Sequence, residues 1–277
     1  MRNRLPALFF IFFVVGLCVA IALRVTLVRS FTDPVTGFYI GKYATLTPIL
    51  TIVTIVCALI LLVPLFFPEK VLSPAPLSDK NAPLGTLAAL SALALLVLGL
   101  SLFFSLVTTS TSGGLFLDAL FTLAAAVYFG LQAKAFFTVV RTPNAWVALL
   151  PVLWATVHLI VSWMRFTTVV NISANLFDLL KMVAFMLFFY YHARLFGGVS
   201  NGREHRGLLS FGLLATFFGL LSAVPPLWVR LTGGRVGAFQ LPDAIATLVL
   251  SVYILVLLVQ LFLRRPTEKP EKVRPAV

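Results

Sequence analysis

Residues 44–67 read ATLTPILTIVTIVCALILLVPLFF, a run of apolar and hydroxyl-bearing residues that contains no charged side chain. As an α-helix, a run of this length extends about 35 Å at roughly 1.5 Å per residue, which is enough to cross the roughly 30 Å hydrocarbon core of a bilayer. The sequence therefore predicts an all-α, polytopic transmembrane helix bundle of about eight spans. The other seven predicted spans are residues 5–28, 84–107, 115–137, 145–163, 173–196, 207–229 and 242–263.

The composition agrees with a lipid environment. Hydrophobic residues make up 60% of the chain and charged residues only 11%, whereas a soluble domain carries about 25% charged residues. The net charge of +12 comes from single or paired lysines and arginines near the ends of the runs, where they suit lipid headgroups rather than a nucleic acid. We therefore expect the lipid bilayer as a partner and no nucleic-acid binding.

The distribution of charge orients the predicted spans. With both termini in the cytoplasm, 14 Lys and Arg residues lie on the inner side and 6 on the outer side, which is the usual bias. The first run resembles a signal peptide, but it is longer than the usual apolar segment of one, so we expect a retained helix. We predict a single transmembrane helical domain over residues 1–263, followed by a basic, disordered cytoplasmic tail over residues 264–277.

Ionisable residues within spans are the first candidates for a site, because polar groups in hydrocarbon are costly. Lys181 lies about eight residues into the sixth span, and Asp178 precedes it by one turn on the same helix face. This pair can form part of a ligand site. In the alternative interpretation, the Lys181 side chain extends along its own stem toward the outer surface, which is the direction of the helix start.

The fifth span carries a second polar face. His158 and Arg165 are seven residues apart and therefore lie on one side of the helix. A short outer connection makes the fifth and sixth spans antiparallel neighbours, so the two polar faces can meet around a small hydrated site. The alternative is that His158 is a hydrogen-bonded packing residue.

Two further stripes begin at the outer starts of their helices. Asp118 and Tyr128 belong to the fourth span, while Asp243 and Thr247 are four residues apart in the eighth. Carboxylates favour helix starts for electrostatic reasons alone, which is the simpler interpretation. Yet four of the five aspartates fall in the outer half, so we also predict an outward-facing polar vestibule.

Small and hydroxylated residues in the spans are expected to pack helices together, because they allow close backbone approach. Gly212 and Ser222 in the seventh span and Gly130 in the fourth are examples. Pro225 and Pro226 are expected to bend or end the seventh helix near its outer end.

The chain lacks the common enzyme motifs. There is no His-Glu-x-x-His, no Gly-x-Ser-x-Gly and no Gly-rich phosphate loop, and no glutamate lies within a predicted span. His158, His192 and His205 lie at different predicted depths, which disfavours a shared metal. We predict no catalytic residue, no metal site and no cofactor; enzymatic activity stays open but is the weakest hypothesis.

Three segments carry a resemblance. The first outer loop, TDPVTGFY at 32–39, has the composition of a tight turn, and LPVLW at 150–154 and NISANLFD at 171–178 accompany it. The Asp-Pro-x-Thr-Gly-Phe string and these two segments resemble uncharacterised multi-pass membrane proteins of Gram-positive anaerobic bacteria. The resemblance implies a bacterial cytoplasmic membrane and transfers no activity.

Two functions are compatible with these patterns. The first is binding or transport of a small polar solute or ion through a polar site in the outer half of the bilayer, built from His158, Arg165, Asp178, Lys181, Asp118, Tyr128 and Asp243. The alternative is a noncatalytic membrane sensor or assembly subunit that acts through a membrane protein partner, in which the polar stripes only hold helices together.

Overall fold

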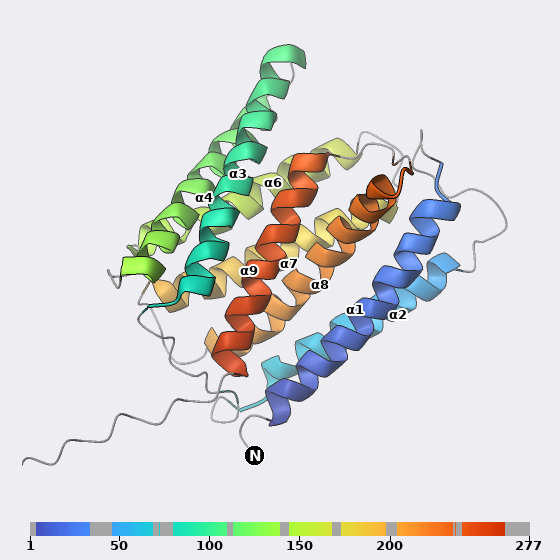
Figure 1. The fold of residues 1–277 in the computed structure, drawn as a ribbon, viewed down its shortest axis with the longest axis horizontal. Coiled ribbons are helices and arrows are strands. Elements are labelled where there is room, and N and C mark those ends of the chain that lie inside the picture. The colour runs from blue at the N-terminus through green and yellow to red at the C-terminus, as the bar shows by residue number, and fades with distance from the viewer. Residues whose placement is uncertain are drawn as a thin grey trace, which may run out of the picture.

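The computed structural model describes residues 4–33, 46–68, 72, 80–109, 113–138, 144–167, 173–197, 204–234, 236 and 240–263. These residues form helices, and no strand occurs among them. The helices are α1 (Arg4–Ser30), α2 (Leu46–Leu62), the 3₁₀ helix η1 (Val63–Phe66), α3 (Ala82–Thr109), α4 (Gly113–Thr138), α5 (Ala145–Ala148), α6 (Leu150–Thr167), α7 (Ser173–Phe196), α8 (Glu204–Leu231) and α9 (Leu241–Phe262) (Figure 1).

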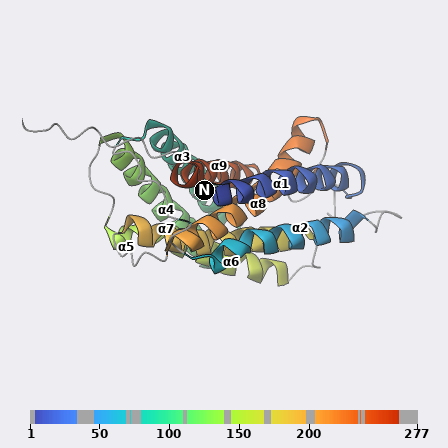
Figure 2. The same cartoon turned by 90° about the horizontal axis from the view of Figure 1, so that it is seen from below.

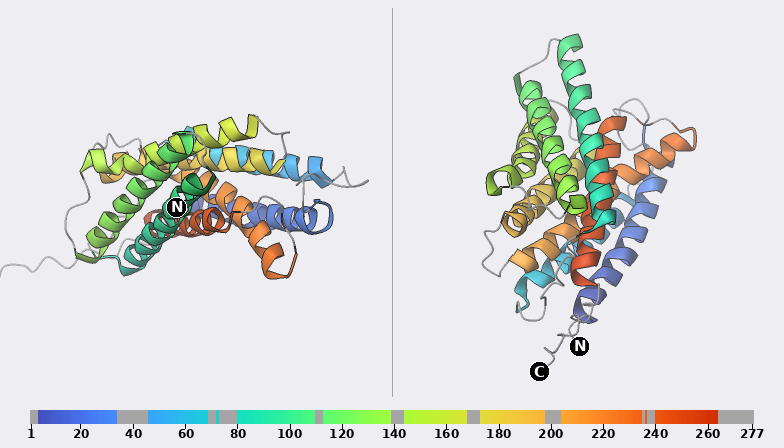
Figure 3. Two further views of the ribbon diagram at one scale, coloured as in Figure 1. Left: turned by 90° about the horizontal axis from the view of Figure 1, so that it is seen from above. Right: turned by 60° about the vertical axis from the view of Figure 1, so that its left-hand side comes forward.

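Eight helical segments in the described part of the chain are long and apolar enough to cross a membrane. This finding confirms the predicted all-α, polytopic class. An even number of spans returns the chain to the side on which it started, and α1 begins at the same end of the bundle at which α9 ends (Figure 3). The cytoplasmic location of that end stays a prediction, and residues 34–39 and the tail 264–277 lie outside the described residues.

Prolines explain where two predicted spans divide. The span predicted at 145–163 is α5 followed by α6, because Pro151 has no N–H to continue the helical ladder. The backbone N–H of Leu149 instead donates to the Trp146 carbonyl at 3.3 Å. In the same way, Pro64 lies at the start of η1, where α2 gives way to a 3₁₀ turn.

Six helices form a closed ring in which each packs against the next. The order around the ring is α3, α4, α6, α7, α8, α9 and back to α3. In Figure 2, α3, α9 and α1 form one row of the flattened bundle, and α4, α7, α6 and α2 form the other. Side chains on the inner faces of the ring helices are therefore enclosed by protein rather than lipid.

Helices α1 and α2 lie outside the ring and pack on α8. As a result, 83% of the most apolar stretch of α8 is buried inside the protein, whereas only 22% of the corresponding stretch of α2 is buried. The outer face of α2 exposes large apolar side chains such as Ile52 and Leu59, which suit contact with lipid tails.

The sequence predicts that Pro225 and Pro226 bend or end helix α8, and the helix continues through both of them rather than ending there. Its last turns are angled away from the rest of the helix (Figure 3). Pro225 cannot donate a hydrogen bond to the carbonyl of Leu221, four residues earlier, which weakens the ladder at this point. The Arg24 guanidinium of α1 donates to that carbonyl at 2.9 Å and completes the helix from outside.

Candidate functional site

Six of the seven candidate residues lie at one end of the ring, where α4, α7 and α9 begin and α6 ends. We call this the charged end, and we call the six side chains the polar cluster. They come from four helices and comprise Asp118, His158, Arg165, Asp178, Lys181 and Asp243.

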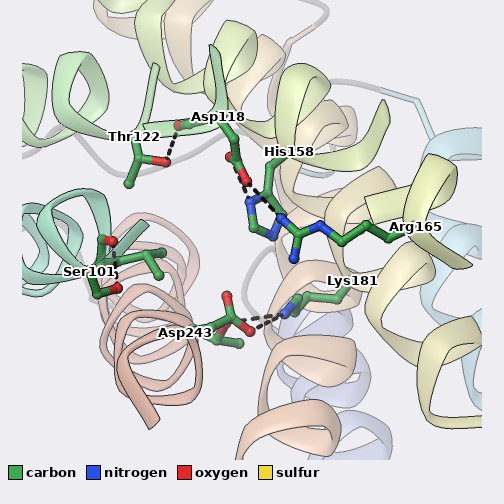
Figure 4. Close-up of polar contacts among 9 residues, drawn as sticks. Ser101, Asp118, Thr122, His158, Arg165, Lys181 and Asp243 are labelled. Atoms are coloured by element: carbon green, nitrogen blue, oxygen red, sulfur yellow. Dashed lines mark hydrogen bonds and ion pairs between the residues drawn. The ribbon is translucent and has the colours of Figure 1, made fainter. Parts of the chain in front are cut away.

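The first half of the polar cluster is centred on Asp118 of α4, whose side chain is fully buried. His158 of α6 places Nδ1 2.9 Å from the Asp118 Oδ1, where the ring N–H donates to the carboxylate (Figure 4). The Arg165 Nη2 lies 3.8 Å from the other carboxylate oxygen. Since His158 and Arg165 are seven residues apart, one face of α6 supplies both partners.

The second half is centred on Lys181 of α7, which is only 1% exposed. Its ammonium donates to Asp243 Oδ2 of α9 at 3.2 Å and to Thr247 Oγ1 at 3.3 Å. It also lies 3.5 Å from Asp178 Oδ1, one turn earlier on α7. The Lys181 side chain therefore ends on carboxylates inside the ring and does not extend to the surface.

Asp178 connects this half to α8. Its Oδ1 accepts a hydrogen bond from the Ser222 hydroxyl. From the sequence, Ser222 is expected only to pack helices together, and Thr247 only to belong to a polar stripe. The Ser222–Asp178 and Thr247–Lys181 contacts join residues far apart in the chain. The only indication of them in the sequence is that Thr247 shares a helix face with Asp243.

The two halves interact electrostatically. The Asp243 carboxylate lies close enough to His158 and Arg165, as well as to Lys181, for Coulomb interaction with each of them. Figure 4 shows the His158 ring and the Arg165 guanidinium between Asp118 and the Lys181–Asp243 pair. The polar cluster is thus one charged network rather than separate helix contacts.

The charges in the network do not balance when the histidine is neutral. Three carboxylates face two permanent cations, and a proton on His158 would supply the third positive charge. Burial is uneven: Asp118 and Lys181 are enclosed, while the side chains of Arg165, Asp178 and Asp243 are 42%, 36% and 27% exposed. A ligand arriving at the charged end can therefore reach both acidic and basic groups.

Tyr128, the seventh candidate, lies elsewhere. It follows Asp118 by ten residues on α4, or about 15 Å along the helix. Its hydroxyl contacts His192 of α7, whose ring also contacts Tyr253 of α9. From the sequence, His192 is considered only as a possible metal ligand, and nothing in the pattern indicates that it contacts two tyrosines.

Among the described residues, no group of three or more His, Cys, Asp or Glu side chains is arranged to hold a metal ion. The polar cluster pairs its carboxylates with the Lys181 ammonium and the Arg165 guanidinium, which are hydrogen-bond donors without a lone pair for a metal ion. Its chemistry suits ion pairing, hydrogen bonding and proton exchange.

Comparison with known proteins assigns the chain to no family. Neither a protein-family model, nor a curated sequence, nor a solved structure matches it. The eight long apolar helices among the described residues fit a multi-pass integral membrane protein.

Proposed function

We propose that the polar cluster binds a small polar solute or an ion and that the protein transports it across the membrane. The observation that carries the proposal is the gathering of six ionisable side chains from four helices at one end of a helix ring. Burying an ion costs several kcal/mol, and apolar residues would hold helices together at lower cost. A role in packing alone does not account for this concentration of charge.

The balance of charge favours a cation or a solute with a cationic group. With His158 neutral, the network carries one more carboxylate than cations, and the half-buried carboxylates are Asp178 and Asp243. A positively charged ligand could pair with these groups while Arg165 interacts with an acidic part of a zwitterion. The ligand would enter with modest rearrangement, because both carboxylates already reach the edge of the ring.

The proposed orientation places the charged end outside the cell. This assignment rests on the distribution of Lys and Arg along the sequence, and the resemblance to bacterial membrane proteins supports a bacterial cytoplasmic membrane. The site would then lie in the outer half of the bilayer.

Ligand-dependent thermal stability tests the proposal. The detergent-purified protein is melted with inorganic cations, amino acids, polyamines and sugars, and Lys181→Met and Asp178→Asn are melted beside the wild type. A ligand present at one hundred times its Kd stabilises the folded state by about 2.7 kcal/mol, so binding raises the melting temperature measurably. We expect one chemical class to stabilise the wild type and neither variant.

Lys134→Met is the matched control, since Lys134 is an exposed residue on α4 toward the opposite end. It should keep the ligand-induced shift. An absent shift with every compound, in a folded wild type, would overturn the proposal. A stable copurifying membrane protein would then support the alternative role as a sensor or assembly subunit.

A further inference from the structure

A second polar group lies inside the ring, away from the polar cluster. The His192 Nδ1 is 3.3 Å from the Tyr128 hydroxyl, and its Nε2 is 3.1 Å from the Tyr253 hydroxyl. All three side chains are fully buried. They come from α7, α4 and α9, and we call them the Tyr–His–Tyr triad.

The triad can exist in two hydrogen-bonded orders. A neutral imidazole carries one N–H and one bare nitrogen, so one tyrosine hydroxyl donates to the ring and the other accepts from it. If Tyr128 donates to Nδ1, then the Nε2–H donates to Tyr253, and the reverse order is equally well formed. When a proton enters one ring nitrogen and another leaves the opposite nitrogen, the order reverses and the charge of the ring is unchanged.

The triad lies at a constant distance from the polar cluster on each of three helices. Asp118 precedes Tyr128 by ten residues, Lys181 precedes His192 by eleven, and Asp243 precedes Tyr253 by ten. At about 1.5 Å per residue, the two polar layers are roughly 15 Å apart. They are successive levels within the same ring.

Buried polar atoms extend this series on both sides of the triad. The Trp154 Nε1, one turn from His158 on α6, has no hydrogen-bond partner among the described residues. Neither amide atom of Gln132, one turn beyond Tyr128 on α4, has one either. Buried polar groups of this kind usually bind water, because leaving each unpaired costs about 1–3 kcal/mol.

The series reaches the opposite end of the ring. Gln260 lies seven residues beyond Tyr253 on α9, and its amide oxygen accepts a hydrogen bond from the Asn81 side chain beside the start of α3. Polar groups therefore recur from His158 through Trp154, the triad and Gln132 to Asn81 and Gln260. The surroundings of His192 are otherwise aromatic, with the rings of Phe188, Phe189 and Phe196 around it.

We infer that the Tyr–His–Tyr triad is a proton relay that carries protons between the polar cluster and the opposite end of the ring. A proton taken up at the Asp118–His158 pair passes through water to one tyrosine hydroxyl. His192 accepts a proton on the nearer ring nitrogen and releases one from the other to the second tyrosine and the water beyond. Rotation of the hydroxyls and a flip of the imidazole ring, which carries its single N–H proton to the side of the second tyrosine, then restore the first order.

This inference rests on the proposed function and deepens it, since proton movement would drive movement of the solute. A packing role alone explains the triad poorly. Three phenylalanines already line the site, and a fourth apolar ring in place of His192 would avoid burying an imidazole and two hydroxyls.

Proton flux into proteoliposomes tests the relay. A potassium gradient with valinomycin sets the membrane potential, and a trapped fluorescent pH dye reports proton entry. We expect the wild type to admit protons at least tenfold faster than protein-free vesicles. His192→Gln keeps hydrogen-bonding atoms but cannot exchange protons between two ring nitrogens, so it should lose most of this flux. Tyr128→Phe and Tyr253→Phe should do the same with almost unchanged volume.

Tyr190→Phe is the matched control, because Tyr190 lies on the same helix, is 43% exposed and is not part of the triad. It should keep the wild-type flux. Melting temperature and gel filtration verify that each variant is folded, and the two Tyr→Phe variants serve if His192→Gln is not.

Two outcomes would overturn the relay: wild-type flux no greater than that of empty vesicles, or folded triad variants that conduct as the wild type does. The ligand-induced melting shift is measured on the same preparations. A preserved shift without proton flux sinks the relay and leaves the binding site in place. Triad-dependent flux without any ligand shift keeps the relay and overturns the proposed solute site.

Discussion

The Lys181 ammonium and the Asp243 carboxylate meet 3.2 Å apart although 62 residues separate them in the chain. Their helices, α7 and α9, are joined only through α8 in the ring order. The ion pair therefore crosses the interior of the ring. The energetic coupling between the two residues, measured with single and double variants, therefore tests this arrangement directly.

We predict that Lys181→Met is strongly destabilising. The substitution leaves Asp243 and Asp178 without their shared cation, and breaking a buried ion pair costs about 3–5 kcal/mol. Asp243 is partly exposed, so we expect about 3 kcal/mol, and less for Lys134→Met on the lipid-facing side. Reversible unfolding in detergent measures both values.

The double variant Lys181→Met/Asp243→Asn should cost less than the sum of its single variants, by about 1 kcal/mol or more. When both charges are removed, Asp178 is the one remaining carboxylate that has lost its pairing with Lys181. Strict additivity of the two single changes would contradict direct pairing between α7 and α9.

A second prediction concerns Asp118. In Asp118→Asn the side-chain oxygen can still accept from His158, but the negative charge that faces both His158 and Arg165 is lost. We expect weaker binding of a cationic ligand, by tenfold or more, with a smaller effect on folding. Ligand titration followed by melting temperature measures the change.

Thr122→Val is the control for Asp118→Asn. The Thr122 hydroxyl donates to the Asp118 backbone carbonyl at 2.6 Å and takes no part in the charged network. Its loss should leave ligand affinity unchanged. Equal losses in the two variants would show that the fourth helix responds to any polar change, and the assignment of Asp118 to the site would fail.

Much of the fold follows from the sequence because a bilayer imposes a length on every span. Each of the eight apolar runs is long enough for a helix, so their number and approximate limits can be predicted. The breaks between α5 and α6 and between α2 and η1 are harder to predict, because a proline can either lie within a continuous helix or interrupt it. Helix α8 shows the opposite outcome at Pro225, where a neighbouring arginine replaces the missing donor.

The candidate site is partly readable for a similar reason. Spacing on one helix puts Asp178 beside Lys181 and His158 on the same face as Arg165. Which helices face one another is decided by packing between segments far apart in sequence, and periodicity contains no such information. The pairing of Lys181 with Asp243, and of Tyr128 with His192 rather than with the charged residues, could be learned only from the structure.

A third prediction separates two glycines that small size alone would assign to helix contacts. A Cβ at Gly212 would lie 2.8 Å from Leu258 and 3.1 Å from Phe188, both fully buried, whereas a Cβ at Gly130 meets nothing within 4 Å. Gly212→Ala should destabilise by about 1–3 kcal/mol because a packed core cannot absorb the methyl group. Gly130→Ala should be neutral or stabilising by up to about 1 kcal/mol. Unfolding curves of the two variants that coincide would contradict the close packing of α8 against α7 and α9.

The last prediction concerns the contact between Arg24 and the Leu221 carbonyl. Arg24 is 5% exposed, and its guanidinium also lies 4.3 Å from the centre of the Phe177 ring. In an uninterrupted helix, the N–H of residue 225 would donate to Leu221, and Pro225 has none. Arg24→Met should therefore leave a buried carbonyl unpaired and cost about 1–3 kcal/mol, in addition to the loss of the cation–π contact.

Pro225→Ala supplies the missing N–H and makes the cause of that cost testable. If the helix closes its own hydrogen bond, Arg24→Met should be milder in the Pro225→Ala background than in the wild type by about 1 kcal/mol. Unfolding of the wild type, both single variants and the double variant gives this difference directly. An equal cost of Arg24→Met in both backgrounds would mean that the arginine stabilises α1 through its other contacts, and that the carbonyl freed by the proline is not what it completes.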